Sequence, residues 1–296
     1  MRNKNFEKSC NCNLCGSSNK KNIFRSEEYP DQWNSDVVCC KNCGLTFRTK
    51  SFIVNSHISD EIILLSYPDE YTTEKTNLFN NYTKLISPYR KHNRILDIGS
   101  GKGLFVNLCA KQNWDVSGVE INPELVDYTK KLYDIEVYKG KLEKALFPTC
   151  YFDVVTFWNV FDHLLNPMQT LHETYRILRQ GGAVFLRFPN ASFHIPSRLV
   201  FAKLYKFWKT IRIYDHSAIH QFAFTRRTIM LYLKKVGFED YLIQHAKLSF
   251  AYGATESFNA RNMTGILIKT LADIIKIISL NHYFLSPSLL VKAVKA

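Results

Sequence analysis

The sequence predicts an α/β protein, with a mostly parallel sheet and an antiparallel last strand, preceded by a small cysteine-rich module. Three observations carry this prediction. Apolar segments alternate with amphipathic segments from Arg94 onward, a glycine-rich turn follows the first of them, and six of the eight cysteines lie in the first 43 residues. With 296 residues, 46% of them hydrophobic, the chain has enough apolar material for a sizeable core.

The cysteine-rich module spans residues 1–50. Cys12 and Cys15 form one C-x-x-C pair, Cys40 and Cys43 form a second, and a glycine follows each pair. Two such pairs suit one tetrahedral zinc ion, because each tight turn presents two thiolates to the metal. We therefore predict a zinc ribbon with these four ligands, and incidental free thiols are the alternative. The ribbon either stabilises a segment too small to fold alone or contacts substrate or nucleic acid.

Residues 51–92 are predicted to be a linker and a lid helix. Leu78, Tyr82 and Leu85 recur at helical spacing, and Pro88 ends the pattern. The helix therefore leads directly into the first strand of the main domain.

The main domain is predicted over residues 93–296, with inserts at about 191–220 and 250–285. The expected strands are 94–98, 114–120, 135–138, 153–158, 183–188, 239–247 and 288–294. The expected helices are about 102–112, 123–132, 167–179 and 225–236. Continuous apolar strands that alternate with helices indicate a parallel sheet covered on both faces.

The strongest motif is ILDIGSGKG at residues 95–103, where a strand runs into a glycine-rich turn that opens a helix. Gly99 and Gly101 let a ligand approach the backbone, and the helix N-terminus adds hydrogen-bond donors. Asp97 ends the strand, where its carboxylate either orients the loop or holds an ammonium group. Glu120 ends the next strand, where an acid accepts hydrogen bonds from a ribose diol. The spacing is G-x-G-x-G, which disfavours NAD or a nucleotide-sugar, the alternative ligands for such a turn.

Several segments in this order resemble the class I S-adenosylmethionine-dependent methyltransferases. They are LDIGSGKG (96–103), GVEINP (118–123), FDVVTFW (152–158), RILRQGG (176–182) and FPN (188–190). The resemblance covers roughly residues 67–247. It implies a Rossmann-like fold, methyltransferase activity and S-adenosyl-L-methionine as the cofactor.

A ribbon before such a domain, with Trp158 and His163 in a W-x-x-x-D-H segment after the fourth strand, resembles methyltransferases of bacterial polysaccharide and sugar modification. The domain is also similar to the ubiquinone-pathway O-methyltransferases. The resemblance assigns the cofactor contacts to Asp97, Gly99 and Gly101 (methionine part), Glu120 (ribose), Ile121 and Leu142 (adenine) and Trp158 (sulfonium side).

Two histidines are the candidate catalytic residues. His163 lies just past the carboxyl end of the fourth strand, the edge at which open α/β sheets bind ligands. Its side chain suits a general base for a hydroxyl acceptor, and a structural role in the loop is the alternative. His220 occupies the place of a family H-x-x-x-F-[ST] segment that can line the acceptor pocket.

The net charge is +13, from 39 Lys+Arg against 26 Asp+Glu, which favours an anionic partner. Residues 198–212 interleave basic and aromatic side chains, and residues 266–280 have a similar character. Both read as amphipathic helices. They either pack on the domain with solvated lysines or make peripheral contact with an anionic membrane surface, whereas nucleic acid is disfavoured because no RNA-binding motif is visible.

The sequence favours a cytoplasmic enzyme, because no signal peptide begins it and no uninterrupted apolar stretch is long enough to span a membrane. We expect methyl transfer, through oxygen, to a small or lipid-linked acceptor such as a sugar or polysaccharide intermediate. An RNA methyltransferase is the enzymatic alternative, although the fourth strand lacks the N/D-P-P-Y sequence of amine methylation. A non-catalytic zinc-ribbon binding module is the alternative of another class.

Overall fold

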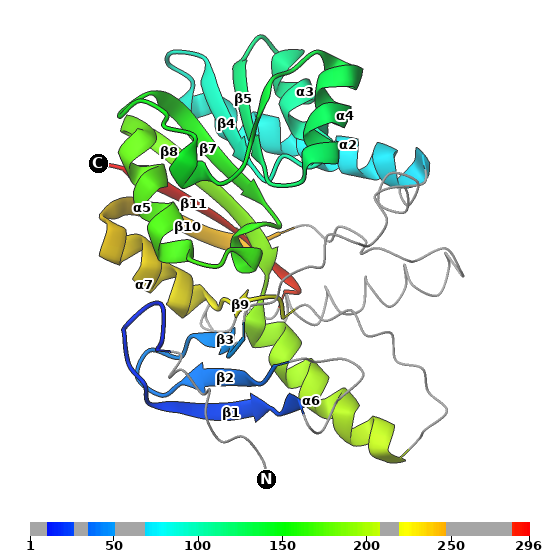
Figure 1. Ribbon diagram of the computed structural model, residues 1–296, viewed down its shortest axis with the longest axis vertical. Coiled ribbons are helices and arrows are strands. Elements are labelled where there is room, and N and C mark those ends of the chain that lie inside the picture. Colours follow the sequence, from blue (N-terminus) through cyan, green and yellow to red (C-terminus); the bar gives the residue numbers. More distant parts are fainter. Residues whose placement is uncertain (1–10, 27–34, 51–68, 208–218, 247–285) are drawn as a thin grey trace.

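A seven-stranded sheet forms the centre of the computed structural model, which describes residues 11–26, 35–50, 69–207, 219–246 and 286–296 (Figure 1). The strand order is β10-β11-β8-β7-β4-β5-β6. The strands are β4 (Arg94–Ile98), β5 (Asp115–Glu120), β6 (Val137–Lys139), β7 (Phe152–Trp158), β8 (Leu178–Pro189), β10 (Phe238–His245) and β11 (Ser288–Lys295). Neighbours are parallel except at β11, which runs antiparallel to both β8 and β10. This confirms the predicted sheet and its antiparallel last strand.

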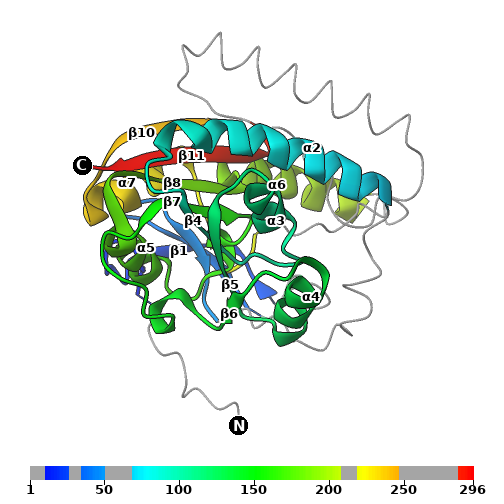
Figure 2. The same ribbon diagram turned by 90° about the horizontal axis from the view of Figure 1, so that it is seen from above.

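Helices cover both faces of this sheet (Figures 1 and 2). They are α2 (Asp69–Ile86), α3 (Leu104–Ala110), α4 (Pro123–Tyr133), α5 (Pro167–Ile177), α6 (Ala191–Phe207) and α7 (Arg226–Val236), with 3₁₀ turns η2 (Ser87–Tyr89), η3 (Leu142–Lys144) and η4 (Phe161–His163). Side chains alternate along β7, so Val154 and Trp158 pack toward α2 and α3, whereas Val155 and Phe157 pack toward α5 and α7. The fully buried β7 therefore anchors two apolar cores, one on each face.

The boundary between α5 and β8 differs from the prediction. We expected the helix to reach residue 179, but α5 ends at Ile177 and β8 begins at Leu178. The fully buried carboxylate of Asp153 accepts the backbone N–H groups of Lys91, His92 and Arg94, where the chain enters β4. Arg179 completes this site, because its Nε donates to Asp153 Oδ1 at 2.5 Å and its Nη2 donates to the carbonyl of Tyr89 at 2.7 Å. These bonds satisfy the buried charge and hold Arg179 beside β7, where Leu178 pairs with Phe152 in place of a further helical turn.

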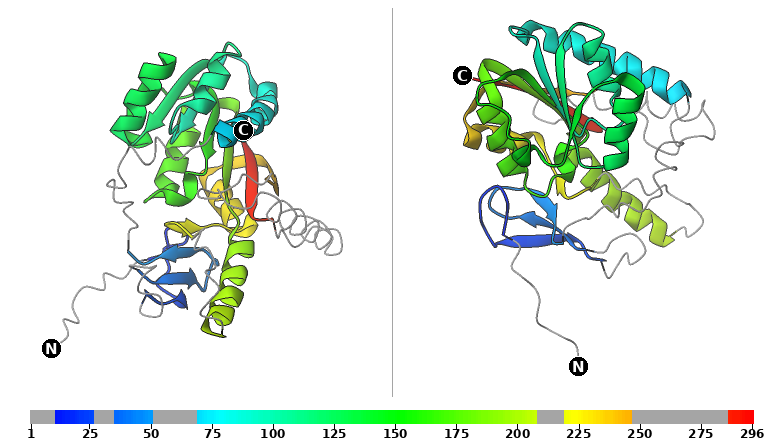
Figure 3. Two further views of the ribbon diagram at one scale, coloured as in Figure 1. Left: turned by 90° about the vertical axis from the view of Figure 1, so that its right-hand side faces the viewer. Right: turned by 45° about the horizontal axis from the view of Figure 1, so that its top comes forward.

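A second sheet contains the cysteine-rich module, with β1 (Lys20–Phe24), β2 (Val37–Cys40) and β3 (Thr46–Arg48) in that order. Its fourth strand, β9 (Phe222–Ala223), comes from the main domain and pairs antiparallel with β3. The sequence analysis did not anticipate this strand, which lies about 175 residues along the chain from its partner. Figure 3 shows the ribbon strands beside the main sheet, with α6 running alongside them.

The start of α6 packs on the ribbon, because Ala191 and Ile195 share an apolar cluster with Phe24 and Val37. A helix thus runs through the first part of the basic segment that we predicted as amphipathic, and residues 208–212 lie outside the described residues. The linker residues 51–68 and the stretch 266–280 also lie outside them. Among the helices that the structure describes, none has both the length and the apolar character to cross a membrane.

Candidate active site

The glycine-rich turn between β4 and α3 has a left-handed backbone at each glycine. The φ angles are 69° at Gly99, 55° at Gly101 and 73° at Gly103. A Cβ at Gly99 would lie 2.3 Å from Val160, and one at Gly103 would lie 2.4 Å from Thr129. At Gly101 a Cβ would meet nothing within 4 Å. Two glycines are therefore needed for packing, and Gly101 faces open space where a ligand can approach the backbone.

Glu120 ties this turn to the end of β5. Its Oε2 accepts the Gly101 N–H at 2.9 Å, and its Oε1 accepts the N–H groups of Ile121 at 2.8 Å and Asn122 at 2.9 Å. The side chain is buried at 8% exposure. Oε1 already accepts two bonds, whereas Oε2 accepts one and retains a lone pair for a further donor, so Glu120 can both hold the turn and accept a hydroxyl.

Asp97 lies buried below the turn at the end of β4. Thr156 Oγ1 on β7 donates to Asp97 Oδ1 at 2.6 Å. Burial raises the pKa of Asp97 to about 7, the negative charge of Glu120 adds to the rise, and Thr156 and Lys75 oppose it. An ammonium group placed here would be held by the ionised carboxylate.

A histidine pair with a buried carboxylate lies past the end of β7. The rings of His163 and His220 stack with centroids 3.7 Å apart, and His220 Nε2 lies 3.7 Å from Asp162 Oδ2. Asp162 is 1% exposed, and neither carboxylate oxygen has a hydrogen-bond partner among the described residues. Burial raises the pKa of Asp162. Burial, together with the charges of His163, Arg48 and His194, lowers the pKa of His220 to about 3, so His220 is neutral at neutral pH.

One side-chain nitrogen or oxygen atom from each of Asp162, His163 and His220 lies within 4.8 Å of the other two, a spacing also seen at metal sites. A metal bound by imidazole lies in the ring plane at about 2.0 Å from the nitrogen. The two rings are tilted by only 25°, so their planes do not meet within that reach. The arrangement suits proton transfer better than metal binding.

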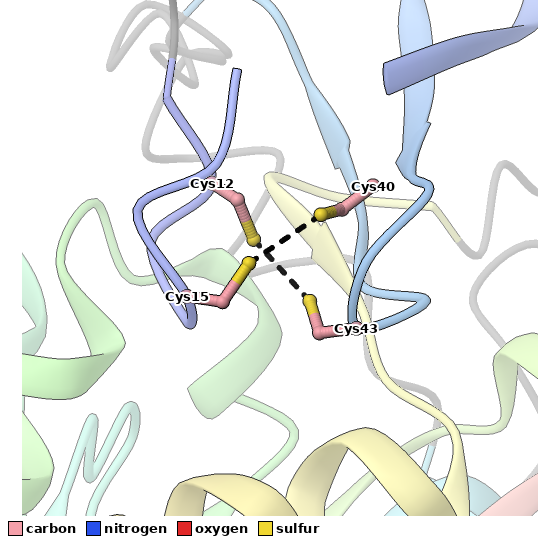
Figure 4. A group of neighbouring side chains, drawn as sticks. All are labelled: Cys12, Cys15, Cys40 and Cys43. Carbon is pink, nitrogen blue, oxygen red and sulfur yellow. Dashed lines mark hydrogen bonds between the residues drawn. The ribbon is translucent and has the colours of Figure 1, made fainter. Parts of the chain in front are cut away.

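The four predicted ribbon cysteines converge on one point (Figure 4). The Sγ atoms of Cys12 and Cys43 lie 3.5 Å apart, as do those of Cys15 and Cys40. A tetrahedral zinc ion with bonds of about 2.3 Å separates its sulfur ligands by about 3.8 Å. All four side chains are free thiols, and three of them are buried. The cluster is compatible with a zinc ion.

A family profile described as "Methyltransferase domain" matches residues 72–243, more than half of the chain. The chain belongs to this methyltransferase family. The match begins within α2 and ends within β10, so it includes the glycine turn, Glu120 and both histidines.

The methyltransferase domain is 30% identical over 107 residues to a ubiquinone biosynthesis O-methyltransferase of Azoarcus sp. (strain BH72), covering 34% of this chain and 46% of that protein. The chain thus spans about half the length of that relative. It is 27% identical over 186 residues to a demethylmenaquinone methyltransferase of Chlorobaculum parvum, covering 55% of this chain and 73% of that protein. A crystal structure of a SAM dependent methyltransferase from Archaeoglobus fulgidus matches with a TM-score of 0.50 at 20% identity, over 74% of this chain and 94% of that one. This likeness shows the fold.

The remaining predicted cofactor contacts occupy different surroundings in the methyltransferase domain. Ile121 follows Glu120 and is 66% exposed beside the turn. Leu142 begins η3 and is buried in the core. Trp158 ends β7, where it stacks on Tyr82 of α2 with centroids 4.4 Å apart, and its Nε1 has no hydrogen-bond partner among the described residues.

Two residues of the methyltransferase domain escaped the sequence analysis. Lys75 on α2 lies close enough to Asp97 for each charge to stabilise the other, while burial lowers the pKa of Lys75. No spacing marks Lys75, because only the packing of α2 on α3 brings it to the turn. Thr156 is one residue of an apolar strand, and only its register opposite Asp97 makes it a donor.

The ribbon also bonds to the methyltransferase domain beside α5 and α7. Asn13 Nδ2 donates to Asn166 Oδ1 at 3.0 Å, and Tyr232 Oη donates to Asn13 Oδ1 at 2.7 Å. Lys235 Nζ donates to the carbonyl of Leu14 at 2.8 Å. Both cysteine loops share one apolar cluster with this face of the sheet, so the ribbon is packed against the domain rather than separate from it.

Proposed function

We propose that this chain is an S-adenosylmethionine-dependent O-methyltransferase whose acceptor is a small or lipid-linked hydroxyl compound, a sugar or polysaccharide intermediate in the first place. The observation that carries the proposal is the open backbone at Gly101, bordered by the acids Glu120 and Asp97. His163 follows β7, the strand beside β4, and His220 stacks on it, so the pair lies at the same sheet edge.

The residues around the turn fit the cofactor. S-adenosylmethionine supplies, when bound, a methyl group already activated on a sulfonium. Glu120 would accept hydrogen bonds from its ribose, and the exposed side chain of Ile121 would lie against the adenine. Asp97 would hold the ammonium of the methionine part, and Lys75 would pair with its carboxylate.

The histidine pair would take the proton of the acceptor. Methyl transfer forms an oxygen–carbon bond as the sulfur–carbon bond breaks, and the hydroxyl proton must leave the oxygen. His163 is the proposed base. The buried carboxylate of Asp162 would stabilise the positive charge that develops on the stacked rings. The aromatic cluster of α2, α3 and Trp158 would exclude water from the cofactor side.

The acceptor class is tested by a transfer assay with S-adenosylmethionine carrying a tritiated methyl group. The acceptors are nucleotide-linked sugars, lipid-linked saccharides in vesicles, a polyprenylated catechol and bulk RNA. The proposal predicts label in one of the sugar acceptors. Mild acid, which cleaves the bond between the sugar and its phosphate carrier, should then separate the label from the nucleotide or lipid. Label in the catechol would instead support a quinone-type acceptor, as in the ubiquinone and demethylmenaquinone methyltransferases to which this chain is similar. Label in RNA, with a steep loss at higher salt, would contradict the proposal.

Lys75→Met should weaken binding of S-adenosylhomocysteine about three- to tenfold, because it removes a charge partner for the methionine carboxylate. Calorimetric titration measures the change. Lys84→Met is the matched control, since Lys84 is exposed in the last turn of the same helix. Equal affinities for both variants would remove Lys75 from the site.

We also propose that the four cysteines hold one structural zinc ion. Metal analysis should find about one zinc per chain, and Cys43→Ser should reduce this to well under half and lower the melting temperature. Cys39→Ser is the matched control, because Cys39 adjoins Cys40 but its Sγ lies against the carbonyls of Cys40 and Gly44. Loss of zinc in Cys39→Ser together with retention of zinc in Cys43→Ser would overturn the assignment of the four ligands.

A further inference from the structure

The last residue of β3 joins the ribbon to the segment that carries His220. The Arg48 side chain is only 1% exposed. Its Nε donates to the carbonyls of Ile219 at 3.2 Å and His220 at 3.0 Å, and its Nη2 donates to Ile219 at 3.0 Å. Arg48 and Gln221 add two more bonds, from the Arg48 N–H to the Gln221 carbonyl and from Gln221 Nε2 to the Arg48 carbonyl. The guanidinium therefore holds the backbone by hydrogen bonds to the carbonyls on either side of the His220 Cα.

Hydrogen bonds along β3 connect Arg48 to the cysteine cluster. Cys40 ends β2, and its N–H donates to the Leu45 carbonyl just before β3. The next pairs along the sheet are Thr46 with Ala223 and Phe47 with Phe222, which join β3 to β9. The loop that carries Cys40 and Cys43, the strand β3 and the His220 segment thus form one hydrogen-bonded unit.

Burying an arginine is costly unless its donors are satisfied, and a smaller apolar residue would pack here at less cost. Nε and Nη2 of Arg48 donate to the backbone carbonyls of Ile219 and His220, and the ring of His220 stacks on His163. The position of the ring relative to His163 and Asp162 therefore depends on these hydrogen bonds of Arg48.

We propose that Arg48 is a positioning residue: it holds His220 against His163 and Asp162, and so makes the geometry of the histidine pair depend on the metal-loaded ribbon. The catalytic part of this inference rests on the proposed function, in which the pair takes the acceptor proton. A ribbon without its ion would loosen β3, release the His220 segment and separate the two rings.

His220 itself reports the state of the pair. Among the residues that the structure describes, the charged and titratable groups that face it are Asp162, His163, Arg48 and His194. Burial holds its pKa far below the ordinary value, at about 3. A released segment would let water reach the ring, and its pKa would rise toward the ordinary value of about 6.5.

The test is a pH titration of ¹⁵N-histidine NMR signals in the full, zinc-loaded chain, with signals assigned from His163→Asn and His220→Asn. Arg48→Lys keeps the positive charge but cannot reproduce the forked donation. We expect wild-type His220 to remain neutral from pH 5 to 8. In Arg48→Lys, and in wild-type protein depleted of zinc by a chelator, we expect it to titrate above pH 5.

Tyr232→Phe and Lys235→Ala are the matched controls, because each removes one bond between ribbon and domain without touching the His220 segment. Both should leave the His220 titration unchanged. The affinity for S-adenosylhomocysteine should stay within about twofold in Arg48→Lys, since the cofactor turn is held by Glu120 at the end of β5.

An unchanged His220 signal in both Arg48→Lys and the zinc-depleted chain would overturn the inference. The same holds if the two controls shift it as much as Arg48→Lys does. The proposed function fails by a separate route, if His163→Asn and His220→Asn both retain methyl transfer. The titration needs no acceptor, so the positioning role is decided even in that case.

Discussion

His163→Asn should lower methyl transfer by about a hundredfold or more while leaving the affinity for S-adenosylhomocysteine unchanged. The imidazole lies past the end of β7 and stacks on His220 above the buried Asp162, so its loss removes the proposed proton acceptor and leaves the cofactor turn intact. Turnover is measured with the acceptor identified in the tritium assay, and cofactor affinity by calorimetry.

His172→Asn is the matched control, because His172 is exposed on α5. It should retain wild-type turnover. If His163→Asn did so as well, His163 would have only a structural role in η4. A loss of turnover in His220→Asn alone would then assign the role of proton acceptor to His220.

Glu120→Ala should weaken S-adenosylhomocysteine binding by more than about tenfold. The carboxylate accepts three backbone N–H groups that hold the turn, and it is the proposed partner of the ribose hydroxyls. The substitution removes both functions at once. Glu120→Gln keeps an acceptor oxygen and should lose less affinity, which separates hydrogen bonding from charge.

Glu124→Ala is the control for Glu120→Ala, because Glu124 is an exposed acid in the first turn of α4. It changes the net charge equally and should bind as the wild type does. An affinity of Glu120→Ala within twofold of the wild type would contradict the assignment of Glu120, whatever the result for His163.

Much of the main domain could be predicted from local pattern. The fully apolar β7, the glycine turn and the acid that ends β5 are each encoded within a few consecutive residues, and the parallel topology follows from their alternation with helices. The cysteine cluster was equally local, since each pair supplies its two thiols from one tight turn. The prediction and the structure therefore agree for the features that a few consecutive residues encode.

The contacts that join distant segments could not be read from the sequence. Nothing in the short segment Phe222–Ala223 marks it as the partner of β3, because two-residue strands carry no periodicity. The α5 boundary depends on Arg179 reaching Asp153, and the proximity of Lys75 to Asp97 depends on helix packing. In each case the deciding contact comes from an element far along the chain.

The central claim, that the turn between β4 and α3 with Glu120 binds S-adenosylmethionine, is tested most directly by calorimetric titration of the folded, zinc-assayed chain with S-adenosylhomocysteine. The account predicts one site per chain with micromolar affinity, lost in Glu120→Ala and retained in Glu124→Ala. Absence of binding to folded, zinc-loaded protein, together with binding of a nicotinamide dinucleotide or RNA in the same titration, would contradict it.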